Sequence, residues 1–386
     1  MKIEIKNLKK AANRIQRAVK NKEKIILYGD ADLDGISSVI ILKETIKSLG
    51  AEIENIYFPN REKEGYGLNE KALSFLSKSA PALFIVLDCG ISNFEEMKLA
   101  KKMGFEVVII DHHEILEKLP QASIIIDPKQ RDDKYPFKQF ATAGLVFKLS
   151  QLLLEEKNNQ SLIKNFSELA ALATIADMMP EVEENKKIID EGLRLLESTW
   201  RPGLKVFFEM ELFKDYKSTR EIAQKIISAL NAGEHQNYLH ESYLLLTTSF
   251  QGEAKNLAKN LLEKAYQKQA QVREITEEIK GRSSQKLKEN IIFEGDSSWP
   301  FLLVGPIASK VYAYFQKPTF IFKNNGKESL GAVRTPKDIN GVSALIGCQK
   351  FLKTFGGHPQ AAGFRLENTN LENFKKCLTK YFEEKT

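Results

Sequence analysis

Acidic and imidazole side chains cluster directly after apolar runs of this 386-residue sequence. Such groups are unfavourable to crowd together unless a cation neutralises them. The simplest chemistry for this crowding is a site in which two divalent metal ions cut a phosphoester. The candidate residues are Asp30, Asp32 and Asp34 after residues 24–28, Asp88 after residues 83–87, Asp111, His112 and His113 after residues 107–110, and Asp177 after residues 167–176.

Each group, taken singly, also has a purely structural interpretation. The acids of residues 30–34 suit a solvated turn at a helix N-terminus, and Asp88 suits a cap at the end of a strand. The triplet Asp111-His112-His113 is more specific, because hard cations prefer carboxylate oxygens and Mn²⁺ also accepts imidazole. In contrast, His235 and His240 lie in a polar stretch, and we predict that they are surface residues without a role.

A run of very small residues near the end of the sequence is a candidate phosphate site. Gly356-Gly357-His358 is followed shortly by Ala361-Ala362-Gly363. Glycine permits close approach of the backbone to a ligand, and backbone N–H groups can then hold a phosphate. The structural alternative is a tight turn between a strand and a helix, in which small residues serve packing.

Alternating strand-like and helix-like segments can bring the metal candidates together. Short apolar runs separated by segments of helix length indicate a parallel sheet with helices on both faces. Ligands bind beyond the carboxyl ends of the strands in such folds, and three candidate acids follow those ends. The predicted strands are 24–28, 53–58, 83–88, 106–111 and 123–127, and the predicted helices lie near 36–49, 68–78 and 93–103.

The remainder of the sequence predicts a helical region and a second α/β domain. Apolar residues recur at helical spacing in 141–155 and 167–178, and a polar stretch with a narrow apolar seam predicts one long helix over 251–288. Strand-like segments return after residue 289. We therefore expect a catalytic domain over 1–185, a helical connector over 186–288 and a smaller α/β domain over 289–386.

Composition sets broad limits on the class of protein. A chain of 386 residues with 42% hydrophobic and 28% charged residues is typical of a globular protein with two domains. The net charge of +6 mildly favours a polyanionic partner. Three cysteines are too few and too scattered for a disulfide framework or a zinc knuckle, and we expect Cys89 to be a small buried residue. No long apolar span or secretory leader is visible, so we expect a cytoplasmic protein.

The order of the motifs resembles that of the DHH phosphoesterase superfamily, and within it the RecJ exonucleases. The matching motifs are Asp32-Leu33-Asp34-Gly35, Asp88-Cys89-Gly90, Asp111-His112-His113, Ala176-Asp177 and the closing Gly356-Gly357-His358. Further stretches that fit are Pro59-Asn60-Arg61 and Gly331-Ala332-Val333-Arg334-Thr335. The resemblance covers about residues 20 to 365, and the set in this order is far more specific than any single motif.

The resemblance implies a role for each candidate residue. By similarity, two ions would be held, with Asp88 bridging them, by Asp32, Asp34, Asp88, His112 and Asp177. Asp30 would be a further ligand, whereas Asp111 and His113 would orient ligands or contact the phosphate. The second domain would hold the substrate phosphate through Arg334, Gly356, Gly357 and His358. The expected ions are Mn²⁺, with Mg²⁺ as the other candidate, and the expected product is a nucleoside 5′-monophosphate.

Some features depart from the family pattern. Tyr28 stands where many relatives have a histidine, which would weaken the hold on the first metal, and Asn231-Ala232-Gly233-Glu234 lacks the family's arginine. We see no room for the family's C-terminal oligonucleotide-binding barrel, which would weaken binding to long strands. The expected function is that of a 5′→3′ exonuclease on single-stranded DNA. The expected partner is single-stranded nucleic acid and not a membrane, and the sequence does not indicate an oligomeric state. The alternatives are a phosphodiesterase for short oligoribonucleotides or cyclic dinucleotides, and an inactive scaffold.

Overall fold

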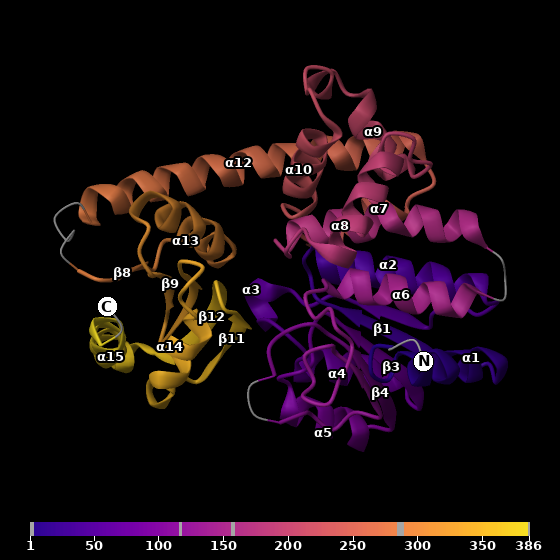
Figure 1. Cartoon of the computed structure of the whole chain (residues 1–386), viewed down its shortest axis with the longest axis horizontal. Coiled ribbons are helices and arrows are strands. Elements are labelled where there is room, and N and C mark those ends of the chain that lie inside the picture. The colour runs from indigo at the N-terminus through magenta and orange to yellow at the C-terminus, as the bar shows by residue number, and fades with distance from the viewer. Residues whose placement is uncertain (1–3, 116–117, 156–158, 284–288, 385–386) are drawn as a thin grey trace. The chain divides into compact units, whose positions relative to one another are not determined.

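The computed structural model describes residues 4–115, 118–155, 159–283 and 289–384. The chain divides into two compact units, residues 1–265 and residues 266–386 (Figure 1). We call them the first unit and the second unit. Among the described helices, none is long and apolar enough to cross a membrane.

The first unit is built on a five-stranded parallel sheet with the order β2-β1-β3-β4-β5. Every residue of β1 and β3 is buried, as expected for strands that are covered on both faces. The fold class predicted from the alternating pattern is therefore confirmed. The strands are β1 (Ile25–Gly29), β2 (Asn55–Tyr57), β3 (Ala82–Leu87), β4 (Phe105–Ile110) and β5 (Ile124–Ile126).

Helices cover both faces of this sheet (Figure 1). Alternate strand residues point to opposite faces, so Ile25 and Leu27 join one apolar core while Ile26 and Tyr28 join the other. The first core contains α1 (Leu8–Lys20), α2 (Leu33–Ser48) and α6 (Thr142–Leu154). The second core contains α4 (Glu70–Leu76) and α5 (Phe94–Lys102), and the short α3 (Arg61–Glu64) follows β2.

Further helices extend the first core. Gly192 of α8 allows close packing on α7, because an added Cβ would lie 2.3 Å from the carbonyl oxygen of Ser167. Buried residues of α7 to α11 share the core that covers the parallel sheet. The elements are α7 (Gln160–Ala176), α8 (Glu183–Leu196), α9 (Pro202–Glu209), α10 (Thr219–Leu230), β6 (His235–Gln236), β7 (Leu239–His240) and α11 (Glu241–Thr247).

The predicted long helix is present as α12 (Gln251–Ser283). Its early residues Ala254, Ala258 and Leu261 are buried in the first core. Its later residues Val272 and Ile279 are buried in a core of the second unit. The last part of the predicted span, residues 284–288, lies outside the described residues.

The second unit contains a five-stranded mixed sheet with the order β11-β12-β10-β9-β8. Only β8 and β9 pair in parallel; the other neighbours are antiparallel. The glycine-rich closing motif forms the hairpin of β11 and β12 rather than a turn between a strand and a helix. The elements are β8 (Ile292–Asp296), α13 (Phe301–Phe315), β9 (Thr319–Asn325), β10 (Glu328–Arg334), α14 (Gly341–Gly347), β11 (Thr354–His358), β12 (Ala361–Glu367) and α15 (Leu371–Glu383).

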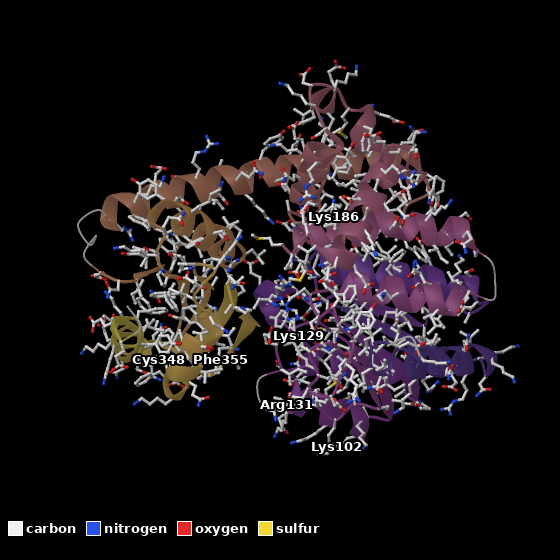
Figure 2. The ribbon with its side chains drawn as sticks, viewed as in Figure 1. Lys102, Lys129, Arg131, Lys186, Cys348 and Phe355 are labelled. Atoms are coloured by element: carbon white, nitrogen blue, oxygen red, sulfur yellow. A yellow bond between two sulfur atoms is a disulfide. The ribbon has the colours of Figure 1, made fainter. Side chains whose placement is uncertain are left out.

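A disulfide joins Cys348 to Cys377 in the second unit (Figure 2 labels Cys348). It ties the end of α14 to α15 across 29 positions of sequence. This pair was not predicted from the sequence, because only the fold brings the two cysteines together. The third cysteine, Cys89, is buried and free, as predicted.

Candidate metal centre

The sheet places three acids side by side. The backbone N–H of Asp30 donates to Leu87, that of Asp88 to Ile110 and that of Asp111 to Ile126, at 3.0 to 3.1 Å. Each acid therefore extends the hydrogen-bond ladder of its own strand by one residue. The convergence expected from three strand ends is present in the structure.

The loop between β1 and α2 carries the next two acids. Asp32 is the N-cap of α2, and its Oδ1 accepts hydrogen bonds from the backbone N–H groups of Asp34 and Gly35 at 3.1 and 3.2 Å. A Cβ at position 35 would lie 2.3 Å from the carbonyl oxygen of Asp30, so the tight turn requires glycine there. This turn holds Asp34, which is 2% exposed, inside the protein.

The N-terminus of α6 binds the carboxylate of Asp34. The backbone N–H groups of Thr142 and Ala143 each donate to one oxygen of Asp34 at 2.8 Å. The hydroxyl of Thr142 donates to Oδ1 of Asp88 at 2.9 Å. A helix N-terminus favours negative charge, so α6 stabilises this pair of buried acids.

His112 joins the acids of three different elements. Its Nε2 lies 3.4 Å from Oδ1 of Asp88, 3.4 Å from Oδ2 of Asp177 and 3.7 Å from Oδ2 of Asp34. Asp177 ends α7 as its C-cap. Ligand atoms of Asp34, His112 and Asp177 all lie within 4.8 Å of one another, which is compact enough to surround one cation.

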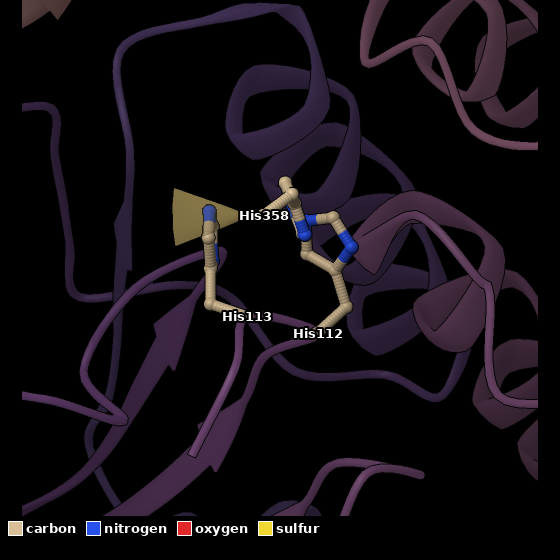
Figure 3. Close-up of side chains that lie close together, drawn as sticks. All are labelled: His112, His113 and His358. Atoms are coloured by element: carbon tan, nitrogen blue, oxygen red, sulfur yellow. The ribbon is translucent and has the colours of Figure 1, made fainter. Parts of the chain in front are cut away.

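Asp111 holds the two histidines through hydrogen bonds. Its Oδ1 accepts the backbone N–H of His112 at 2.8 Å and lies 2.7 Å from Nδ1 of His113, while its Oδ2 accepts the N–H of Ile91 at 3.1 Å. The two imidazole rings lie side by side, with centroids 4.6 Å apart (Figure 3). Burial opposes the charge on His113, but the Asp111 carboxylate prevails and raises the pKa of His113 to about 9.

Asp88 belongs to two further compact groups. Its carboxylate lies within 4.8 Å of ligand atoms of Asp30 and Asp32, and also of Asp111 and His113. Asp88 thus lies between neighbouring candidate cation positions. A residue in this place can bridge two ions.

The centre carries more negative charge than its neighbours compensate. Burial, with a contribution from the charge of Asp32, raises the pKa of Asp34 to about 7. Burial and the neighbouring acids also raise the pKa values of Asp88 and Asp177 well above the ordinary range. Oδ2 of Asp177 is buried and has no hydrogen-bond partner among the described residues. Oxygen donors with one imidazole, held close and short of positive charge, fit a divalent cation such as Mn²⁺.

The second unit arranges the residues predicted to bind phosphate around one strand. Arg334 of β10 and His358 of β11 both pair in register with Ala361 of β12. Gly356 pairs with Gly363, and Gly357 pairs with Ala362 at a φ of +128°. The backbone of Gly357 runs close to β12, because an added Cβ would lie 2.6 Å from the carbonyl oxygen of Ala361.

Arg334 is held without an acidic partner. Its Nε donates to Oγ of Ser309 on α13 at 2.9 Å, and its Nη1 donates to the carbonyl oxygen of Val333 at 2.8 Å. No ion pair with Arg334 is found among the described residues. The guanidinium is half-buried with its charge uncompensated, which suits the binding of an anion.

The family model of the DHH family, N-terminal domain, matches residues 24–174. The first unit contains a DHH domain. The chain is 34% identical over 379 residues to the single-stranded-DNA-specific exonuclease RecJ of Bacillus subtilis, covering 97% of this chain and 48% of that protein. It is 29% identical to RecJ of Thermus thermophilus, covering 98% of this chain and 54% of that protein. It therefore spans about half the length of these curated relatives.

Solved structures share the fold over both units. A crystal structure of exonuclease RecJ bound to manganese matches with a TM-score of 0.78 and 26% identity, covering 99% of this chain and 95% of that one. RecJ of Thermus thermophilus in complex with Mn²⁺ matches with a TM-score of 0.82 at 24% identity, covering 99% of this chain and 55% of that one. The similarity to these solved structures thus extends beyond residues 24–174.

Two residues that shape the centre were given no role from the sequence, although Arg61 stands in the Pro59-Asn60-Arg61 stretch that fits the family. Arg61 makes ion pairs with Asp30 and Asp32, and Thr142 makes the two bonds described above. Arg61 follows a strand end, as the acids do, and a cation in such a place was an available signal. Thr142 carries no local signal, because its role depends on where the N-terminus of α6 docks.

One prediction about the histidines was wrong. His240 is 3% exposed, not a surface residue. Its Nδ1 accepts the backbone N–H of Ser242 at 3.2 Å and so caps α11. Packing on Gly233, which the sequence does not reveal, buries the ring. Tyr28 is also buried and donates its hydroxyl to the carbonyl oxygen of Gly67 at 2.8 Å, in the core on the far side of the sheet from α2.

Proposed function

We propose that this chain is a metal-dependent phosphodiesterase that removes nucleoside 5′-monophosphates from the 5′ end of single-stranded DNA. The observation that carries the proposal is the convergence of Asp34, Asp88, His112 and Asp177 from four separate elements. The similarity to relatives described as single-stranded-DNA-specific exonucleases supports the choice of substrate.

The ligand set in this proposal has two halves that share Asp88. One half is Asp34, His112 and Asp177, and the other is Asp32 with Asp30 as a further ligand. The ions are Mn²⁺, with Mg²⁺ as the other candidate, because relatives are described as complexes with each. Two such ions would lower the pKa of a water and stabilise negative charge on the phosphate.

Asp111 and His113 have the remaining roles in the first unit. Asp111 holds the backbone of His112, and with it the imidazole that faces Asp34 and Asp177. The Asp111 carboxylate beside Nδ1 of His113 raises the pKa of His113 to about 9 in the metal-free protein, which favours the cationic imidazole at neutral pH. A cationic imidazole can donate a hydrogen bond to a phosphate oxygen, which is the role we assign to His113.

The second unit supplies the phosphate-binding residues in this proposal. Arg334 can present its Nη2 group to a phosphate, since its Nε and Nη1 are already held by Ser309 and Val333. Gly356 has open space around it, so its backbone can approach a ligand closely. His358 stands on the same edge strand as Gly356, β11, and would complete the site.

A direct assay tests the proposal. The protein is incubated with Mn²⁺ and DNA or RNA strands of graded length, labelled at either end, and with a cyclic dinucleotide. Release of labelled mononucleotide first from the 5′ end of DNA supports the proposal. If the protein instead prefers short RNA or the cyclic dinucleotide, the proposal is wrong and the chain is a phosphodiesterase for that substrate.

Matched variants make the assay specific to the centre. Asp88→Asn removes the shared carboxylate, and Asp132→Asn removes an exposed carboxylate that pairs with Lys6. Hydrolysis that survives in Asp132→Asn but not in Asp88→Asn belongs to this centre. If the wild-type protein hydrolyses none of these substrates with Mn²⁺ or Mg²⁺, the chain is not such an enzyme.

A further inference from the structure

Arg61 is bound to the acids of one half of the centre only. Its Nε donates to Oδ1 of Asp30 at 2.9 Å, and its Nη2 reaches both Oδ2 of Asp30 and Oδ2 of Asp32, the latter at 2.7 Å. Asp30 is fully buried. A buried carboxylate without a partner is strongly unfavourable, so Arg61 is its counter-ion.

The local structure fixes the position of Arg61. Arg61 is the first residue of α3, and the Asn60 side chain caps this turn by accepting the N–H groups of Glu62 and Lys63 at 3.1 Å. Glu64 accepts the backbone N–H of Asn60 at 2.8 Å and the hydroxyl of Tyr57 at 2.9 Å. The turn is therefore anchored to β2. The turn thus places the arginine side chain beside the acids, with its guanidinium held by Asp30 and Asp32.

In the other half, Asp34 and Asp177 make no ion pair with an arginine or lysine among the described residues, although the charges of His113 and Lys129 are near enough to oppose the rise that burial causes in the pKa of Asp177. The salt bridges of Asp34 and Asp177 among the described residues are with His112 only. The group of Asp30, Asp32 and Asp88 instead includes two acids that already share the guanidinium. A divalent cation entering this group must compete with Arg61 for Asp32.

We propose that Arg61 is a built-in counter-ion that weakens cation binding to the half formed by Asp30, Asp32 and Asp88, so that the half formed by Asp34, His112 and Asp177 fills first. The inference rests on the proposed two-ion function. It concerns the order and strength of ion binding, which are measured without any nucleic acid. Arg61 maintains the acidic loop before the second ion arrives, and it repels that ion by its charge.

Calorimetric titration with Mn²⁺ tests the inference. Loss of Arg61 should raise Mn²⁺ affinity if Arg61 competes with the ion, and should lower it if Arg61 has only a structural role. In Arg61→Gln the weaker class of Mn²⁺ sites should tighten by at least about tenfold, since a positive charge a few ångströms away is removed. The tighter class should change little. If Arg61 only maintained the loop, its loss would weaken Mn²⁺ binding instead.

Two further variants separate charge from geometry. Arg131→Gln removes an exposed positive charge of the first unit (Figure 2) and should leave both classes of site unchanged. Arg61→Lys loses the forked geometry that holds two carboxylates but keeps the charge. Because the charge is kept, the Mn²⁺ affinity of the weaker class of sites should remain close to that of the wild type. A tightening in Arg131→Gln equal to that in Arg61→Gln would overturn the inference.

Stability of the metal-free protein provides a second readout. Arg61→Gln should lower the midpoint of thermal unfolding, and addition of Asp30→Asn should restore it, because the pair is then removed together. If the Mn²⁺ affinity of the weaker class of sites falls or stays unchanged in a folded Arg61→Gln protein, the inference is overturned. Wild-type protein that binds Mn²⁺ but hydrolyses nothing overturns only the proposed function, whereas absence of any Mn²⁺ binding overturns both.

Discussion

The hydroxyl of Thr142 donates a hydrogen bond of 2.9 Å to Oδ1 of Asp88. The same residue binds Asp34 through its backbone, so it fixes the spacing of two candidate ligands. Thr142→Val keeps the shape and the backbone bond but removes the hydroxyl. We expect Mn²⁺ affinity to fall about 10- to 100-fold, as is usual when a group that orients a ligand is lost. Calorimetry should show recovery in Thr142→Ser; weak binding in both variants would contradict the role of the hydroxyl.

Asp88 has a φ of +63°, a conformation that asparagine tolerates well. Asp88→Asn should therefore keep the fold while it abolishes Mn²⁺-dependent hydrolysis. The metal-free variant should unfold at the same or a higher temperature than the wild type, because a neutral amide replaces a buried carboxyl whose ionisation is unfavourable there. Near-normal turnover in Asp88→Asn would disprove its bridging role.

The stability of the metal-free protein should fall as pH rises. The pKa of Asp34 is about 7 in the folded protein and 3.8 in the unfolded chain, so the folded state holds an additional proton between these values. Its contribution to stability is complete below about pH 4 and is lost as pH rises through about 7. The raised pKa values of Asp88 and Asp177 act in the same direction.

Chemical denaturation with a chelator, from about pH 5 to about pH 8, measures this trend. Saturating Mn²⁺ should remove the part of this pH dependence that comes from the acids of the centre, because cations then replace the protons. A metal-free stability that increases over this range would contradict the assignment of the raised pKa values to these buried acids.

Arg334→Ala should weaken substrate binding rather than metal binding. Loss of a charged hydrogen bond to phosphate predicts a rise in KM of about 10- to 100-fold, with unchanged Mn²⁺ affinity. Arg365→Ala is the matched control, because Arg365 lies in the same sheet but is paired with Glu328. Equal losses of substrate and metal affinity in Arg334→Ala would count against a phosphate role.

Cys377→Ser should destabilise the oxidised protein. The disulfide with Cys348 closes a loop of 29 positions, which predicts a loss of about 3.6 kcal/mol of unfolding free energy for the second unit. Denaturant melts with and without a reductant provide the test. The variant should be insensitive to reductant, since Cys89 is buried and unpaired.

The positions of the acids could be predicted because a parallel sheet imposes them. Asp30, Asp88 and Asp111 each follow an apolar run, and the carboxyl ends of parallel strands lie along one edge. The spacing of His112 from Asp177, which ends a helix, follows less directly from pattern alone. It depends on the docking of α7 on the core.

Residues whose role arises from packing could not be predicted in this way. Thr142 meets Asp88 only because the first turn of α6 docks against Asp34 at the start of α2 and against Asp88 at the end of β3. His240 is buried by a hairpin within a polar stretch, and Cys348 meets Cys377 through the fold of the second unit. Local composition carries no information about such distant neighbours.

Asp177 is the C-cap of α7, at the end of the helix where the backbone carbonyls already concentrate negative charge. A carboxylate there lowers the stability of the metal-free protein and becomes favourable only beside a cation. Directed evolution of this chain for heat resistance in chelating buffer would therefore tend to replace Asp177 with a neutral or basic residue. Such a screen would yield heat-stable proteins whose centre no longer binds the ion, unless manganese were present throughout the selection.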